Sequence, residues 1–168
     1  RTLEADIALL NGMANVVVFA PTESEMYPQN QPFEPMELGD IGRVLEGEKR
    51  PGHFDGVVHV VHHLFALIQP HKAYFGEKDF QQLALIRKMT ADLALPIEII
   101  GVPTVRAESG LALSSRNGYL NAQELSLAPY LYQVMQAIAE RVSAGERDMA
   151  TLAKEYAAQL DSKGFKTD

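Results

Sequence analysis

Residues 72–102 read KAYFGEKDFQQLALIRKMTADLALPIEIIGV, and this stretch decides the fold class. It opens with a strand pattern at residues 72–75, continues with an amphipathic helix pattern at 79–93, and closes with an apolar strand pattern at 97–102. Helices that alternate with such strands are typical of a parallel α/β layer. The sequence therefore predicts an α/β fold with a parallel sheet and helices. The apolar stripe of the helix consists of Leu83, Ile86, Met89 and Leu93.

The residues before this stretch extend the same pattern towards the amino terminus. Amphipathic helices are predicted at residues 2–10 and 56–68. The continuous apolar, β-branched run NVVVFA at residues 15–20 predicts a strand that is buried on both faces. Residues 21–52 are rich in Pro, Gly and acidic residues, so we expect a long irregular connection with an extended piece around residues 33–38.

The sequence changes in character near residues 103–106, where we place a domain boundary. A polar, turn-rich segment at 108–118 comes first. Asn121 and Glu124 then have the spacing of a capping box, and Pro129 is expected to open a helix. Asp148 is expected to cap the last helix. The predicted inward residues of these two helices are Leu131, Met135, Ile138, Val142, Leu152, Tyr156 and Leu160.

Composition excludes several classes of protein. The 168 residues contain no Cys, which excludes disulfides and cysteine-based metal or nucleophile chemistry. Lys and Arg total 15 against 22 Asp and Glu, and the net charge of -7 argues against partners such as nucleic acids or anionic membranes. No apolar run approaches the about 18 residues of a membrane span, and residues 1–12 do not have the pattern of a signal peptide. We expect a cytoplasmic protein.

The segment FGEKDFQQ, residues 75–82, is the first that can carry chemistry. It follows a predicted strand and opens a helix, and free N–H groups at a helix start suit phosphate. Gly76 permits close approach of a ligand, Lys78 adds a cation, and Gln82 lies one helical turn further on the same face. The alternative is structural: Asp79 caps the helix, while Lys78 and Gln82 lie at the surface.

The segment LALSSRNGYL, residues 111–120, is the second. Ser114, Ser115 and Arg116 place two hydroxyls beside one guanidinium, a combination that binds polyphosphates. Asn117 and the glycine after it mark a turn. The alternative is a capped turn with an exposed arginine.

The histidines allow a third interpretation. His59 and His63 have a spacing that can chelate a metal, but no glutamate completes the motif and the helix is otherwise apolar. We therefore predict no metal site formed by protein side chains, and expect His59, His62 and His63 to pack against other residues. His53 lies in a loop with basic neighbours, where a ligand contact or a mobile lid is plausible.

In this order, the segments resemble the pantothenate synthetase (pantoate:β-alanine ligase) family. The resemblance covers essentially the whole chain, and the combination of FGEKDFQQLALIRKM with LSSRNGYL is highly specific for the family. It implies a Rossmann-like nucleotidyltransferase domain, to which residues 1–104 would belong, followed by a smaller helix-rich domain that begins with residues 105–168. The matching stretches are RTLEAD, LEGEKRPGHFDGVV, FGEKDFQQLALIRKM, IIGVPTVR and GLALSSRNGYL.

The resemblance also implies an activity. Pantoate would be activated by ATP to a pantoyl adenylate with release of pyrophosphate, and β-alanine would then displace AMP to give pantothenate. Lys78, Ser114, Ser115 and Arg116 would be the catalytic residues, and Gln82 would bind pantoate. Mg²⁺ and a homodimer are further expectations. The implied ATP-binding residues are Gly76, Glu77, Lys78, Asp79, Val105, Leu113, Ser114, Ser115 and Arg116.

One feature of the family has no counterpart in residues 1–168. The family's HIGH-like segment, which carries a catalytic histidine, is not found here, whereas SSRN at residues 114–117 stands where the KMSKS-like segment is expected. We therefore expect an internal fragment that lacks this upstream segment and the carboxyl-terminal end. An alternative function follows: an inactive fragment that acts only as a nucleotide-binding or dimerisation module.

Overall fold

The computed structural model describes residues 3–27 and 36–167. Residue contacts divide the chain into two compact units. The first unit comprises residues 1–73 and 84–99, and the second comprises residues 74–83 and 100–168. The domain boundary expected between residues 104 and 105 stays a prediction.

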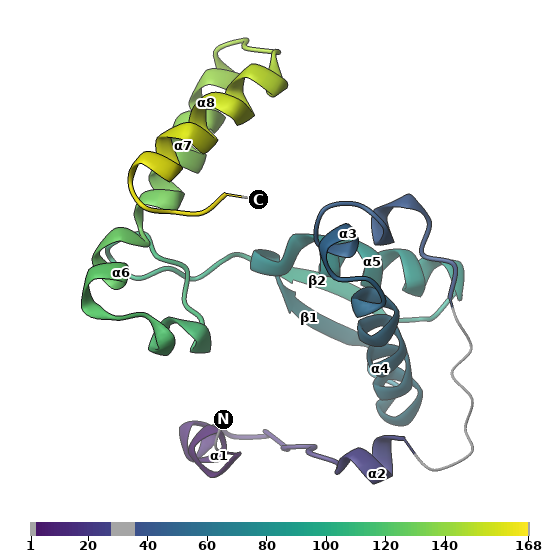
Figure 1. The fold of residues 1–168 in the computed structure, drawn as a ribbon. Coiled ribbons are helices and arrows are strands. Elements are labelled where there is room, and N and C mark those ends of the chain that lie inside the picture. Colours follow the sequence, from purple (N-terminus) through teal and green to yellow (C-terminus); the bar gives the residue numbers. More distant parts are fainter. Residues whose placement is uncertain (1–2, 28–35, 168) are drawn as a thin grey trace. The chain divides into compact units, whose positions relative to one another are not determined.

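A strand–helix–strand element links the two units. Strand β1 (Lys72–Gly76) leads through the single 3₁₀ turn η2 (Glu77–Asp79) into helix α5 (Phe80–Asp92), and the chain returns in strand β2 (Glu98–Val102). The two strands lie side by side and form a parallel sheet (Figure 1). This arrangement confirms the predicted α/β fold. A salt bridge of 3.1 Å between Lys72 Nζ and Glu98 Oε2 joins the first residues of the strands.

Helix α5 buries its apolar side almost completely. Leu83, Leu85, Ile86 and Met89 are each at most 2% exposed. Leu93, which was predicted to belong to the same stripe, is 43% exposed because α5 ends at Asp92. The buried polar residue is Thr90, whose hydroxyl donates a hydrogen bond of 2.8 Å to the Ile86 carbonyl and so avoids the cost of an unpaired polar group.

Helix α4 (His53–Ile68) begins three residues before its predicted start. Its buried residues are Phe54, Val58 and Phe65. The predicted start at residue 56 was too late because no capping side chain marks it: the residue before the helix is Gly52, which has a φ of 78°.

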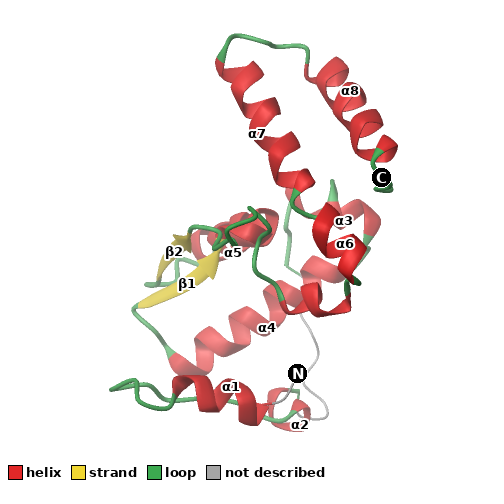
Figure 2. Ribbon diagram, turned by 90° about the vertical axis from the view of Figure 1, so that its left-hand side faces the viewer, coloured by secondary structure: helices red, strands yellow, loops and turns green. Residues whose placement is uncertain are grey.

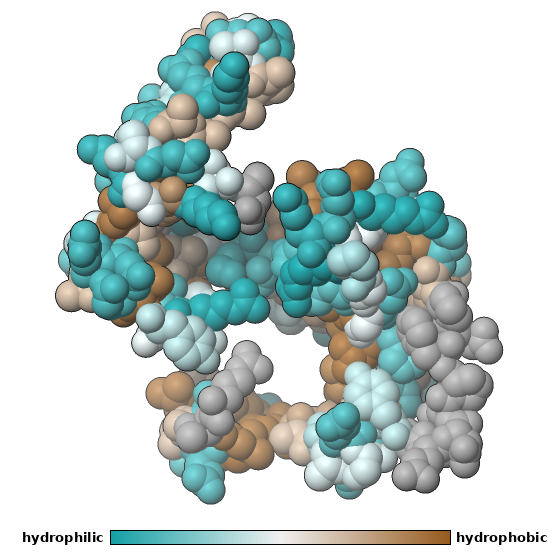
Figure 3. Space-filling view, in the orientation of Figure 1, coloured by the Kyte–Doolittle hydropathy of each residue, from teal (hydrophilic) through white to brown (hydrophobic). Residues whose placement is uncertain are grey.

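The prediction of a strand at residues 15–20 was wrong. Val16, Val17, Val18 and Phe19 are between 42% and 90% exposed and have no regular secondary structure. A strand needs a hydrogen-bonded neighbour, and in the described residues β1 and β2 pair only with each other. Helix α1 (Leu3–Leu10), which was predicted, also buries none of its residues. Figure 3 accordingly shows hydrophobic residues at the surface of this part of the chain.

The described residues of the connection predicted to be irregular include three single helical turns. They are α2 (Glu23–Met26), η1 (Asp40–Gly42) and α3 (Glu46–Lys49). Thr22 and Glu25 form a capping box at the start of α2. Of the expected extended piece, residues 33–35 lie outside the described residues, and residues 36–38 have no regular structure.

The second unit has a core formed by two paired helices. Helix α7 (Tyr130–Ser143) lies beside helix α8 (Met149–Ser162) (Figures 1 and 2). The buried residues of this core are Val134, Leu152, Tyr156 and Leu160. The predicted inward side of α7 was partly wrong, because Leu131 and Met135 are 45% and 52% exposed. A helix that packs against one neighbour buries a narrow stripe, and in α7 that stripe includes Val134, Ile138 and Val142.

The helix starts in this unit follow the predicted signals. Asn121 and Glu124 form the capping box of α6 (Ala122–Leu127), and Pro129 is the residue before α7. Asp148 caps α8 and accepts hydrogen bonds from the Thr151 hydroxyl (2.7 Å) and the Thr151 amide (3.0 Å). These bonds stabilise the carboxylate and lower the pKa of Asp148.

Candidate functional site

Residues 105–113 form a short antiparallel hairpin in the second unit. The Leu113 amide donates a hydrogen bond of 2.9 Å to the Val105 carbonyl, and the Ala107 amide donates one of the same length to Leu111. The turn is closed by Gly110, whose positive φ of 92° favours glycine. The hairpin thus brings Val105 beside Leu113, two residues that were predicted to line one site.

The SSRN segment follows the hairpin directly and is held by its own hydrogen bonds. It forms the 3₁₀ turn η3 (Ser115–Tyr119), which is capped by Ser114: the Ser114 hydroxyl accepts a hydrogen bond of 3.2 Å from the Arg116 amide. The Asn117 side chain donates a bond of 3.0 Å to the Ala112 carbonyl, which ties the turn back to the hairpin. Within the described residues, the exposed Arg116 guanidinium has no hydrogen bond or ion pair.

The FGEKD segment lies where β1 ends and α5 begins. In parallel α/β sheets, this carboxyl edge of the strands is where ligands bind. The space beside Gly76 is open, because nothing lies within 4 Å of the position that a Cβ would occupy there. The ammonium of Lys78 lies 3.3 Å from the carboxylate of Asp79, and the two side chains are 41% and 61% exposed. Gln82 follows in the first turn of α5 and is half-buried.

The structural alternative for Asp79 receives little support. Helix α5 begins at Phe80, close to the predicted start, but Asp79 itself lies in η2. Its only hydrogen bond among the described residues comes from Lys78, so its carboxylate caps no amide of α5. The charged groups of Lys78 and Asp79 therefore remain accessible to a ligand.

All predicted site residues lie in the second unit, because it includes residues 74–83 as well as 100–168. Within each segment the structure brings the candidates together. Between the segments, no hydrogen bond or ion pair joins Lys78 or Asp79 to Ser114, Ser115 or Arg116 in the described part of the chain. Lys78 and Arg116 are thus separate, exposed cations, and each could bind an anion.

Sequence reasoning missed a contact between the hairpin residue Arg106 and Tyr132. The Arg106 guanidinium lies 3.6 Å from the centre of the Tyr132 ring, and it donates a hydrogen bond of 3.2 Å to the Gly110 carbonyl. Tyr132 belongs to the first turn of α7. No sequence pattern links Arg106 to Tyr132, because the contact is tertiary. The one available signal was the position of Arg106 directly after Val105, a predicted ATP-binding residue.

The histidines of α4 do not form a metal centre in the described residues, where no three His, Cys, Asp or Glu side chains gather. His59 stacks on Tyr27, with 5.7 Å between the ring centres, and His53 lies 5.1 Å from the Phe54 ring. Both contacts are packing contacts between rings. For His59, this agrees with the expectation that it packs against other residues.

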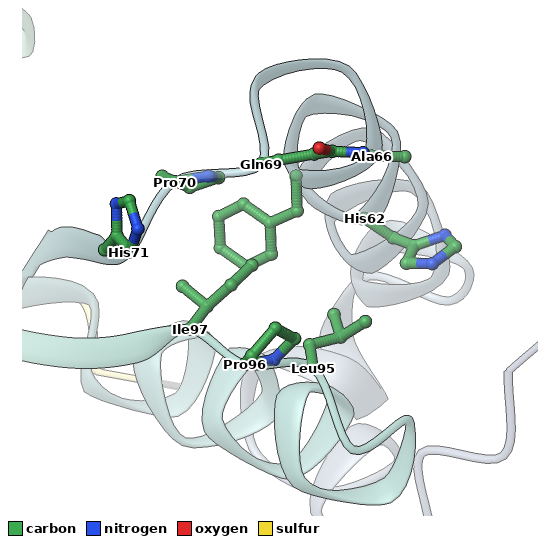
Figure 4. Close-up of a pocket in the computed structure, with 9 residues that line it drawn as sticks. His62, Ala66, Gln69, Pro70, His71, Leu95, Pro96 and Ile97 are labelled. Carbon is green, nitrogen blue, oxygen red and sulfur yellow. The ribbon is translucent and has the colours of Figure 1, made fainter.

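A cavity of about 610 Å³ lies in the first unit (Figure 4). It is found where β1 and β2 begin, whereas the candidate residues near Gly76 lie at the opposite ends of the strands. His62 and His71 lie on opposite sides of Ile97 and do not converge on a common point. A ligand site normally combines apolar walls with polar groups that converge, and the two histidines of this cavity do not converge.

Sequence comparison identifies the relatives of the chain. Residues 1–168 match the model of the Pantoate-beta-alanine ligase family. A pantothenate synthetase from Aeromonas hydrophila subsp. hydrophila is 53% identical over the entire chain. The chain spans 59% of the length of that relative.

Structural comparison points to the same family. A pantothenate synthetase from Thermus thermophilus superposes with a TM-score of 0.86 and 45% identity, over 95% of this chain and 58% of that one. A pantoate-beta-alanine ligase from Francisella tularensis, complexed with beta-gamma ATP and beta-alanine, superposes with a TM-score of 0.80 and 34% identity. That match covers 100% of this chain and 63% of the Francisella chain. In the part of the chain that the model describes, no helix is both long and apolar enough to span a membrane.

Proposed function

Because the chain belongs to the pantoate-beta-alanine ligase family, we propose that its protein joins pantoate to β-alanine at the expense of ATP. The observation that carries the proposal is the pair of exposed cations, Lys78 and Arg116, on two ordered turns of one unit. The Francisella relative supports ATP and β-alanine as ligands, since it is described in complex with beta-gamma ATP and beta-alanine.

The proposed reaction has two steps. The pantoate carboxylate attacks the α-phosphorus of ATP, and the bond to the β-phosphate oxygen breaks, so that pyrophosphate leaves. The amine of β-alanine then attacks the carbonyl carbon of the pantoyl adenylate, loses a proton, and displaces AMP. Two anions must meet in the first step, and negative charge moves onto the leaving pyrophosphate, so fixed cations lower the barrier.

The FGEKDFQQ and LALSSRNGYL segments have different roles in this reaction. Lys78 stabilises the charge that develops on the transferred group, while Ser114, Ser115 and Arg116 hold the β- and γ-phosphates. A guanidinium suits that role because its planar donors bind phosphate oxygens in pairs. Gln82 binds pantoate through its amide, one turn after Lys78. The remaining residues proposed to line the ATP site are Gly76, Glu77, Asp79, Val105 and Leu113.

Mg²⁺ is proposed to enter with ATP. The ion prefers oxygen ligands and usually binds through one or two carboxylates together with substrate phosphates. The exposed carboxylate of Asp79 fits such a partial role, and its position beside Lys78 would place it near the phosphates. Bound there, the ion would neutralise phosphate charge.

The organisation of the whole protein is also a proposal. We propose that residues 1–104 belong to a Rossmann-like domain and that residues 105–168 begin a smaller domain. A cytoplasmic homodimer is proposed as its working state. The family resemblance supports all three statements, and sedimentation of the purified protein tests the homodimer.

The test of the activity is pantoate-dependent exchange of labelled pyrophosphate into ATP. It is measured on the 168-residue chain and on a longer chain that also carries the HIGH-like segment expected of the family. In the form that exchanges, we expect Lys78→Ala to lower kcat by roughly 10²–10³, the scale for one lost electrostatic stabiliser. Lys154→Ala is the matched control, because Lys154 is exposed on α8 in the same unit.

The outcomes of the exchange assay test the adenylate route, the role of Lys78 and the activity separately. Exchange that needs pantoate supports the adenylate route, and exchange without pantoate contradicts it. A loss below about threefold for Lys78→Ala, against an unchanged Lys154→Ala, removes Lys78 from the proposed role. Exchange by neither form contradicts the proposed activity and favours the alternative, an inactive nucleotide-binding or dimerisation module.

A further inference from the structure

The hairpin that leads into Ser114 and Arg116 has few internal bonds. The Leu113, Ala107 and Gly110 amides close it, with hydrogen bonds of 2.8–2.9 Å to carbonyls within residues 105–111. A two-stranded hairpin of this size is at best marginally stable on its own in water. Its position, and that of the SSRN turn beyond it, therefore depends on what it packs against.

The contact that holds it is Tyr132. The guanidinium of Arg106 covers the ring at 3.6 Å from its centre, while Gly110 lies so close to the ring that an added Cβ would be 2.9 Å from Tyr132 Cδ1. The hydrogen bond from Arg106 Nη1 to the Gly110 carbonyl links these two contacts to each other. The first strand of the hairpin, through Arg106, and its turn, through Gly110, thus contact one aromatic ring.

Tyr132 is itself a fixed support. It lies in the first turn of α7, and the next turn contributes Val134 to the core shared with α8. Arg106 and Tyr132 are both half-buried, so solvent competes less for the guanidinium than it would at an open surface. Tyr132 is therefore joined to the helical core through the backbone of α7, and Arg106 joins Tyr132 to the hairpin.

We propose that Arg106 and Tyr132 are a positioning pair that sets the location of Ser114, Ser115 and Arg116 for the phosphates of ATP. This inference rests on the proposed function of those three residues. Arg106 acts through Tyr132 rather than on the nucleotide. Because the phosphates are bound before and during the reaction, loss of the pair raises the KM for ATP more than it lowers kcat.

The test combines an activity measurement with one that needs no activity. Arg106→Ala and Tyr132→Leu are each expected to raise the KM for ATP roughly tenfold, the range of a partly desolvated cation–π contact. Tyr132→Phe keeps the ring and is expected to behave like the unmodified protein. Arg87→Ala, on the exposed side of α5, is the matched arginine control. In parallel, hydrogen exchange of the Ala107 and Leu113 amides is expected to be faster in Arg106→Ala.

A double substitution separates positioning from direct contact. If the pair acts as one unit, Arg106→Ala combined with Tyr132→Leu raises KM no further than either change alone. The proposal would be overturned if the rise in KM of the double variant equalled the product of the two single rises, or if Tyr132→Leu had a normal KM. Either result would mean that Arg106 contacts the nucleotide itself.

Gly110→Ala gives an independent probe that changes no charge. The added methyl meets both the positive φ and the Tyr132 ring, so it is expected to raise KM in the same way. Unchanged amide exchange in Arg106→Ala refutes the positioning pair, whether or not the protein is active. Absence of pantoate-dependent exchange in the unmodified protein refutes only the proposed function, so the two failures are distinguishable.

Discussion

Leu152 and Leu131 lie on the paired helices α8 and α7, and replacing each by alanine tests which side of α7 faces the core. Leu152 is 2% exposed, whereas Leu131 is 45% exposed. The substitution removes the same atoms from both positions and favours helix formation slightly in both. The two variants therefore differ in burial alone and serve as controls for each other.

The expected magnitudes follow from these exposures. At position 152, the loss of three buried carbons costs about 2.4 kcal/mol in transfer free energy, and the remaining cavity brings the total to about 3 kcal/mol. At position 131, about half of that transfer term applies and no closed cavity forms, so about 1 kcal/mol is expected. The difference between the variants in the free energy of unfolding is thus about 2 kcal/mol.

Urea unfolding followed by circular dichroism measures both values, provided that the slope with denaturant is unchanged between the variants. A cost for Leu131→Ala equal to or larger than that for Leu152→Ala would refute the structural assignment. It would mean that α7 turns the stripe of Leu131 and Met135 towards the core, as its sequence pattern suggests.

Two further predictions concern helix caps. Thr151 lowers the pKa of Asp148, so the charged carboxylate stabilises α8 at pH values above the ordinary pKa of an aspartate, and this contribution is lost as the pH falls through the lowered pKa. The destabilisation caused by Asp148→Ala, measured by thermal melting, should therefore shrink below about pH 4; an effect independent of pH would contradict the charged cap. Asn121→Ala removes one half of the capping box of α6 and should lower stability by about 1 kcal/mol, whereas the neighbouring Gln123→Ala should change it little. Equal urea midpoints for these two variants would show that the box contributes nothing.

The sequence correctly predicted those elements whose residues are close together in the chain. The strand–helix–strand element at residues 72–102 was confirmed because apolar periodicity and Gly or Pro breaks define it without help from distant residues. The caps at Asn121 and Asp148 were confirmed for the same reason, since each is made within four residues. The strand at residues 15–20 was wrong because strand formation requires a partner, which the run itself does not specify.

The candidate site shows the same limit. Lys78 and Arg116 were singled out by residue type and by resemblance, and the structure shows that both are exposed on ordered turns; their roles stay predictions. Periodicity could not reveal that Leu131 faces outward, because the buried side of a helix depends on its neighbours. Nor could it pair Arg106 with Tyr132, because they belong to different elements and meet only in the tertiary structure.

The exposed run from Val16 to Phe19 has a consequence for the behaviour of the protein in solution. Its residues favour extended backbone, carry no charge, and form no backbone hydrogen bonds with other described residues. Such a segment is a template on which another chain can add a strand, which is how aggregation starts. Pro21 follows almost at once and has no N–H to donate, so it acts as a gatekeeper that keeps any intermolecular ladder short.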